Sequence, residues 1–173
     1  SSAEKINELF TWLNRIDNSD WLPVAIAFLA RQGNDAAAVL DFISRLERLA
    51  AFLHLTAKNV NQRIERYALV IEDILKGVYV DRVELTPGEC AEMLRALDGN
   101  VYEMTARRRN YLILRLDSFV SAMVANYTPN VLTIEHILPQ TVDPSSEWAT
   151  TWPDAVMRMT WLHRLANLVP LTR

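Results

Sequence analysis

Glu135 and His136 stand side by side in the short apolar run TIEHILPQ, which covers residues 133–140. A carboxylate can bind a hard divalent cation, and a neutral imidazole can take a proton from a water nucleophile. Adjacent residues of a strand point to opposite faces, but a break at the end of the strand can bring both side chains towards one site. The pair could therefore supply a metal ligand and a general base. Acid-histidine pairs also arise by chance in many proteins, so the pair alone is weak evidence of function.

A second apolar run, ANLVPL, follows at residues 166–171, with Asn167 as its polar member. Residues 131–134 favour a short strand, and residues 168–171 within ANLVPL are a second short apolar run of the same kind, because both hold β-branched and other apolar residues. Between them, residues 140–147 are polar and predict a loop, and residues 153–164 are compatible with a helix. We expect a small carboxy-terminal unit that holds two short strands.

The chain before this unit predicts consecutive amphipathic helices, because apolar residues return at steps of three and four. The sequence Thr-Pro-Gly-Glu at residues 86–89 has the features of a capping box, and Gly77 is a plausible helix-ending glycine. Residues 78–85 alternate loosely and predict a short strand or an ordered loop. The predicted helices cover residues 4–17, residues 20–32, a third from the N-cap Asn34, a fourth from the N-cap Thr56 to Gly77, residues 86–99 and residues 105–126. We expect a mainly α fold, with a multi-helix bundle over residues 1–127 and the different unit over residues 128–173.

Composition is that of a folded globular protein, with 50% hydrophobic and 23% charged residues. The net charge of −3 offers no general attraction to nucleic acid, although it divides into −4 over residues 1–100 and +1 over residues 101–173. The single cysteine, Cys90, excludes an internal disulfide and a cysteine-based zinc site, and we expect it to be a small buried residue on a helix. No apolar run approaches the length of about 18 residues that spans a bilayer. We therefore expect a cytoplasmic protein without membrane contact.

The motifs IEHILPQ and ANLVPL together resemble those of HNH nucleases, in which a histidine-ending strand is followed by a loop and an asparagine-leucine strand. With the intervening tryptophans Trp148 and Trp152, they resemble more closely the carboxy-terminal nuclease domain of the GmrSD family of modification-dependent restriction enzymes. The similarity is strongest over residues 107–171. It extends as a pattern into the helical region, through DWLPVAIAFLA, FISRLERLAAF and QRIERYALVIEDI.

The resemblance implies a DNA endonuclease that restricts foreign or modified DNA, with a ββα-metal (HNH) motif as its centre. It assigns His136 to the general base that activates water, and Glu135 to the acidic position that helps to bind Mg²⁺ or a similar divalent ion. Asn167 matches the middle asparagine, which holds the loop and orients the histidine. The implied partners are DNA and an amino-terminal NTP-using domain of the same protein.

The printed sequence departs from the family pattern at Arg173, because the family carries its metal-binding helix beyond the asparagine-leucine strand. We therefore expect the sequence to be a fragment with a partial HNH motif, which binds the catalytic metal poorly and does not cleave DNA by itself. We also find no glycine-rich phosphate loop in it.

Other residues have both a functional and a structural interpretation. Arg107, Arg108 and Arg109 could grip DNA phosphates, or form a solvated helix start with one arginine pairing inward. His163 could approach the site, but a core or surface role is favoured, and for His54 we expect a capping or solvent role near a helix end. The tryptophans Trp148, Trp152 and Trp161 could stack on bases, but packing of the small unit is favoured.

Three functional hypotheses remain open from the sequence. The first is the HNH endonuclease. The second is a helical coupling module that links the NTP-using domain to the nuclease and has no activity of its own. The third is a helical domain in which Glu135 and His136 are merely structural.

Overall fold

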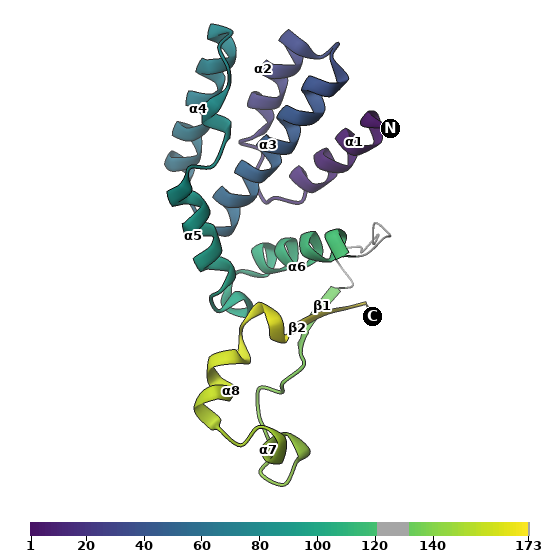
Figure 1. Ribbon diagram of the computed structural model, residues 1–173, viewed down its shortest axis with the longest axis vertical. Coiled ribbons are helices and arrows are strands. Elements are labelled where there is room, and N and C mark those ends of the chain that lie inside the picture. Colours follow the sequence, from purple (N-terminus) through teal and green to yellow (C-terminus); the bar gives the residue numbers. More distant parts are fainter. Residues whose placement is uncertain (121–131, 173) are drawn as a thin grey trace. The chain divides into compact units, whose positions relative to one another are not determined.

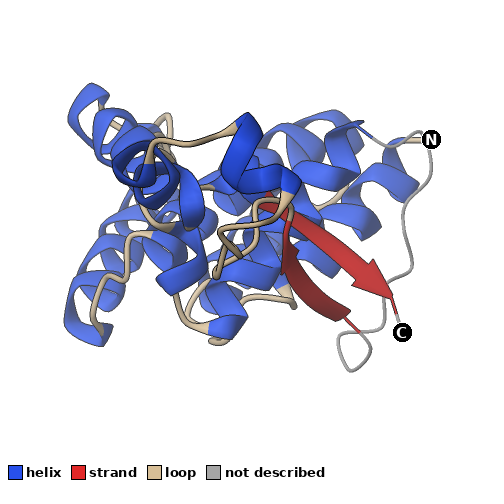
Figure 2. Cartoon of the chain, turned by 90° about the horizontal axis from the view of Figure 1, so that it is seen from below, coloured by secondary structure: helices blue, strands red, loops and turns tan. Residues whose placement is uncertain are grey.

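The computed structural model describes residues 1–120 and 132–172. It is mainly helical, with one small antiparallel sheet of two strands, as Figures 1 and 2 show. The predicted fold class is confirmed to this extent. The chain forms two compact units, Ser1–Met93 and Leu94–Arg173. The predicted boundary between residues 127 and 128 falls outside the described residues.

The first unit is a set of packed helices. Helix α3 packs against α1 and α2, and α2 also packs against α4. In Figure 1 these helices form the purple-to-teal part of the ribbon. The elements are α1 (Ser2–Leu13), α2 (Leu22–Gln32), α3 (Ala36–Leu55), α4 (Val60–Lys76), the 3-10 helix η1 (Asp81–Val83) and the start of α5 (Pro87–Leu97).

Two predicted helix signals are confirmed. Gly77 ends α4 in the left-handed conformation, with φ of 69°, which a glycine adopts without strain. At the start of α5, the Thr86 hydroxyl accepts a hydrogen bond from the Glu89 backbone N–H, and the Glu89 carboxylate accepts one from the Thr86 N–H. This reciprocal pair is the predicted capping box.

Other boundaries differ from the predictions. Asp35 rather than Asn34 caps α3, because its carboxylate accepts from the backbone N–H groups of both Ala37 and Ala38. Asn59 rather than Thr56 caps α4, since the Thr56 hydroxyl donates back to the Phe52 carbonyl at the end of α3. The first helix spans Ser2–Leu13 instead of residues 4–17. Of the two alternatives for residues 78–85, the structure has the ordered loop, which contains the 3-10 turn η1.

The core of the first unit lies along the inward face of α3. Phe42 and Phe52 are fully buried, and the Phe42 ring stacks on Phe28 of α2 with ring centroids 3.8 Å apart. Burial of such aromatic rings is a main source of the stability of a helical unit. Helix α2 is buried on one side only, because Ile26 is exposed on the other.

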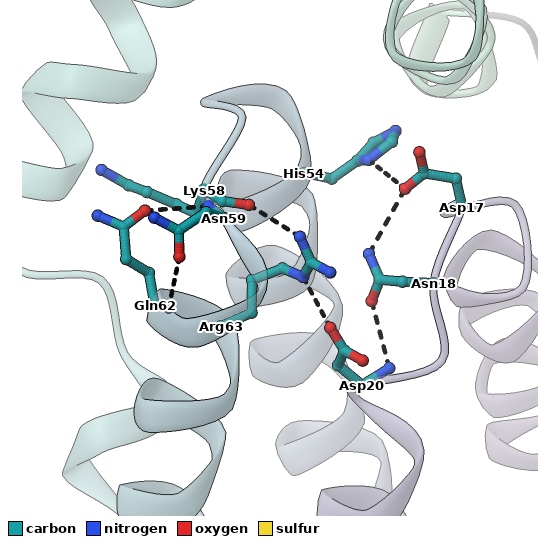
Figure 3. A network of polar contacts seen from close by, with 8 residues as sticks. All are labelled: Asp17, Asn18, Asp20, His54, Lys58, Asn59, Gln62 and Arg63. Atoms are coloured by element: carbon teal, nitrogen blue, oxygen red, sulfur yellow. Dashed lines mark hydrogen bonds and ion pairs between the residues drawn. The ribbon is translucent and has the colours of Figure 1, made fainter.

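A polar network joins the α1–α2 connection to the α3–α4 corner (Figure 3). The Arg63 guanidinium donates from Nε to Asp20 Oδ2 at 2.7 Å and from Nη1 to the Lys58 carbonyl at 2.8 Å. His54 is buried, and its Nδ1 lies 3.2 Å from Asp17 Oδ1. The expected capping or solvent role of His54 is therefore wrong: its imidazole packs inside this corner beside an aspartate.

The second unit contains the sheet. Strand β1 (Leu132–His136) pairs antiparallel with β2 (Leu168–Thr172), and His136 is opposite Leu168 in the register. Helix α6 contacts β2 and the 3-10 helix η2. The remaining elements are η2 (Val101–Glu103), α6 (Ala106–Val120), α7 (Glu147–Thr151), α8 (Ala155–Leu162) and η4 (Leu165–Asn167).

Helix α6 (Ala106–Val120) corresponds to the predicted helix over residues 105–126, and the predicted end of that helix lies outside the described residues. Cys90 on α5 is exposed, so its predicted burial is wrong. The reason is that no side chain of α5 reaches a buried position. Among the described residues, no helix combines the length and apolar character that crossing a membrane requires.

Candidate functional site

The two sequence motifs meet in the small sheet. Both predicted strands are present, and they pair with each other over five residues each. Beyond the end of β1, the Ile137 backbone N–H donates to the Asn167 carbonyl at 2.9 Å. The sheet therefore brings His136 and Asn167 to adjoining positions, although 31 residues separate them in the chain.

The Asn167 carboxamide fixes the turn that follows His136. Its Oδ1 accepts from the Leu138 backbone N–H at 2.6 Å, and its Nδ2 donates to the carbonyls of Leu138 at 3.2 Å and Leu162 at 2.8 Å. The side chain is buried, with 7% of its surface exposed. Buried polar groups without hydrogen bonds are costly, and here one side chain satisfies three backbone groups. Asn167 thus ties both the turn and the end of α8 to the start of β2.

The His136 imidazole is half-buried and has a polar neighbour at each nitrogen. Its Nε2 lies 3.3 Å from His163 Nδ1, and its Nδ1 lies 3.1 Å from Gln140 Nε2. The Tyr102 ring lies against it, with ring centroids 4.2 Å apart. These contacts come from β1, the following turn, the end of α8 and η2.

The surroundings lower the pKa of His136 below its ordinary value of 6.5. Burial is the main cause because it disfavours the charged form, and the neighbouring His163 and Arg109 act in the same direction. The carboxylate of Glu135 opposes them. At neutral pH the imidazole is therefore uncharged, which is the state that can accept a proton.

Glu135 is exposed, whereas its neighbour Ile134 is buried. The alternation of the strand therefore places Glu135 on the solvent side and Ile134 with His136 on the other. In the part of the chain that the structure describes, no group of three or more His, Cys, Asp or Glu side chains is arranged to hold a metal ion. Glu135 alone does not provide the several oxygen ligands that Mg²⁺ takes in proteins.

The three arginines at the start of α6 differ in solvent exposure and in their contacts. Arg107 is exposed and Arg108 is half-buried. Arg109 turns inward: its Nη1 donates to the Tyr102 carbonyl at 2.6 Å, and its guanidinium carbon lies 4.4 Å from the centre of the Tyr102 ring. One arginine pairing inward was the structural interpretation of this run.

Two neighbours of His136 were not singled out by the sequence analysis. Gln140 belongs to the quoted motif, and its four-residue spacing from His136 was a usable signal. Tyr102 lies outside both quoted motifs, and nothing in the sequence around it indicated a role in the site. A role of His163 in the site was considered less favoured than a core or surface role, yet its ring contacts His136 and stacks on Tyr102, with centroids 5.5 Å apart and planes 15° apart.

Of the tryptophans, Trp148 and Trp161 keep a little over a third of their surface exposed.

Comparison with known proteins identifies the segment that carries this site. The chain matches no curated protein and no solved structure. The family of GmrSD restriction endonucleases, C-terminal domain, matches residues 90–173, which include the whole sheet and every neighbour of His136 described above. The resemblance to the GmrSD restriction endonucleases is therefore confirmed over residues 90–173, which match the C-terminal domain of that family.

Proposed function

We propose that the second unit is the catalytic centre of an HNH-type DNA endonuclease, in which His136 is the general base. The observation that carries the proposal is the placement of His136. A neutral imidazole stands at the end of β1 with a lowered pKa, held at both ring nitrogens, within the segment that matches the restriction endonuclease family. A general base of this kind contributes about 10²- to 10⁴-fold to a rate.

In the proposed reaction, His136 takes a proton from a water molecule as the water oxygen attacks a DNA phosphorus atom. A new phosphorus–oxygen bond forms, the bond to the leaving sugar oxygen breaks, and the leaving oxygen takes a proton from solvent. Because the imidazole is neutral before the step and cationic after it, the carboxylate of Glu135 favours the product state of the base.

A divalent metal is part of this proposal for the intact enzyme, as a Lewis acid that offsets the charge developing on the phosphate. Glu135 would contribute one carboxylate ligand. The described residues do not by themselves make up a Mg²⁺ site, so the steps above are derived for His136 and water alone.

Asn167 and the arginines take supporting roles in the proposal. Asn167 holds the turn after β1 and thereby sets the direction of the His136 side chain. Arg107 and Arg108 belong to residues 101–173, which carry a net charge of +1, and would contact DNA phosphates. Arg109 contacts Tyr102 through its guanidinium group, and in the proposal it holds the Tyr102 ring in place instead of binding DNA.

The test is cleavage of supercoiled plasmid by the protein as its gene encodes it, with Mg²⁺ or Mn²⁺. We expect nicking by the wild type, loss of nicking with a chelator, and loss in His136→Ala. Thr151→Ala, an exposed residue of α7, is the control and should cleave as the wild type does. Undiminished cleavage by His136→Ala would overturn the proposal.

We further propose that the first unit couples the nuclease to an amino-terminal NTP-using domain. Two observations favour this second role. The family match starts at residue 90, close to the division of the units after Met93, and residues 1–100 carry a net charge of −4, which opposes DNA binding. A pull-down of the NTP-using domain by residues 1–93 checks it, and salt-sensitive DNA binding by that unit would contradict it.

A further inference from the structure

We propose that His163 is a positioning residue for His136: it accepts a hydrogen bond from His136 Nε2 and so leaves Nδ1 as the nitrogen that takes the proton. The inference deepens the proposed function and rests on it for its catalytic meaning. The hydrogen-bond arrangement itself stands independently of any activity.

The donors and acceptors around His136 fix the arrangement. Gln140 directs its amide Nε2, which carries only donors, at His136 Nδ1 over 3.1 Å. With this amide as the donor, Nδ1 is the acceptor, and the one proton of the neutral ring sits on Nε2. His136 Nε2–H faces His163 Nδ1 at 3.3 Å, so that nitrogen accepts, and the proton of His163 sits on its own Nε2. Each of the two contacts of the His136 ring then joins one donor to one acceptor.

The position of His163 is fixed by its own neighbours. It is the C-cap of α8, and its backbone carbonyl accepts from the Tyr102 N–H at 3.0 Å. Its ring stacks on Tyr102, which also packs on His136 and lies under the Arg109 guanidinium. Tyr102 therefore holds both imidazoles in one orientation, and Nδ1 of His163 has little freedom to turn away from His136.

The other ring nitrogen of His136, Nδ1, has an exposed neighbour. Gln140 is exposed, and it lies in the loop after β1. A water molecule can replace its amide at Nδ1, whereas the acceptor at Nε2 is fixed in the packed unit. When Nδ1 takes the proton, rotation of the Gln140 carboxamide presents its oxygen to the new N–H. The half-buried contact with His163 thus orients the base, and the exposed contact with Gln140 gives way to the nucleophilic water.

The first test is the ring tautomer of His136 in the 173-residue chain, which contains three histidines. Ring-¹⁵N-labelled histidine is observed by long-range ¹H–¹⁵N correlation at about pH 8.5, about two units above the ordinary histidine pKa. We expect an unprotonated Nδ1 and a protonated Nε2 in the wild type. His163→Leu leaves Gln140 in place and should keep the tautomer, but it removes the acceptor at Nε2 and should move the Nε2 ¹⁵N resonance towards that of a ring without a hydrogen bond there, whereas His163→Asn keeps an acceptor oxygen and should hold the resonance near its wild-type position. A wild type protonated on Nδ1, or an Nε2 resonance unchanged in His163→Leu, would overturn the inference.

The second test uses plasmid cleavage by the protein as its gene encodes it. Loss of an orienting partner typically costs about 10- to 100-fold. We expect this loss in kcat for His163→Leu and a rate within about threefold of wild type for His163→Asn. If His136→Ala is inactive while His163→Leu cleaves normally, the inference fails and the proposed function stands. If His136→Ala cleaves normally, the proposed function fails, and the tautomer measurement still decides the hydrogen bonds.

Discussion

Asn167 and Leu138 exchange two hydrogen bonds across the turn that follows β1. The Asn167 Oδ1 accepts from the Leu138 N–H at 2.6 Å, and its Nδ2 donates to the Leu138 carbonyl at 3.2 Å. A carboxamide is the side chain that offers one acceptor and two donors in this way. The relationship explains why an asparagine stands one residue before β2.

Replacement of Asn167 should destabilise the second unit. Asn167→Ala leaves the Leu138 N–H and the carbonyls of Leu138 and Leu162 without these partners in a buried place. We expect the free energy of unfolding to fall by about 2–4 kcal/mol. Urea unfolding measures this change, and hydrogen exchange of the Leu138 amide localises it. Asn100→Ala, at an exposed asparagine, should change stability by less than about 0.5 kcal/mol. Equal effects of the two substitutions would refute the role of Asn167.

The pKa of His136 should lie below 6.5, and NMR titration of its ring protons measures it. Because the Glu135 carboxylate favours the protonated ring, Glu135→Gln should lower this pKa further, whereas Glu147→Gln on exposed α7 should leave it unchanged. The base is active when unprotonated, so cleavage should persist to a lower pH than an ordinary histidine allows. A titration midpoint above 6.5 would contradict the described surroundings.

The same shift links the fold to pH. Between the ordinary pKa of 6.5 and the lower folded value, the unfolded chain binds more protons at His136 than the folded chain does. The contribution of this group to stability is therefore complete above pH 6.5 and declines as the pH falls through the folded pKa. Comparison of wild type with His136→Ala over this range isolates it.

Arg63 should stabilise the corner shown in Figure 3. Arg63→Met removes the bonds to the Asp20 carboxylate and the Lys58 carbonyl, and we expect a loss of about 1–2 kcal/mol in the free energy of unfolding. Arg63→Lys keeps the charge but cannot make both bonds in this geometry, so it should recover only part of the loss. Arg48→Met, at an exposed arginine of α3, is the matched control. Denaturant unfolding of the four proteins gives the comparison.

Arg107 should contribute to DNA affinity in a sequence-independent way. If Arg107 contacts a phosphate, Arg107→Ala reduces the dependence of log affinity on log salt by about one. Fluorescence anisotropy with a labelled duplex over a salt series measures the slope. The control is Arg95→Ala on α5, also exposed, which should leave the slope unchanged. Equal slopes for Arg107→Ala and wild type would remove this residue from the interface.

Local signals in the sequence predicted much of the fold. The Thr86–Glu89 capping box and the Gly77 helix end depend on neighbouring residues only, and both are confirmed. Predictions at Thr56 and Asn34 were wrong because a better-placed side chain, Asn59 or Asp35, competes within a few residues. The capping propensity of a residue therefore locates the start of a helix only to within a few residues.

Burial and side-chain contacts depended on packing between distant segments. His54 was expected near solvent, but the α1–α2 connection covers it with Asp17, 37 residues earlier in the chain. The motifs predicted that β1 and β2 belong together, whereas the contact of His136 with His163 depends on where α8 ends in space. The hydrophobic periodicity of the sequence does not indicate where the end of α8 lies relative to His136.

The central claim is that the imidazole at position 136 takes the proton from water. The most direct measurement is the rate of DNA cleavage by His136→Ala, with and without free imidazole in solution. The proposed function predicts a rate about 10²- to 10⁴-fold below wild type without imidazole, and an increase as imidazole supplies the missing base. Cleavage by His136→Ala at the wild-type rate without imidazole would contradict the claim.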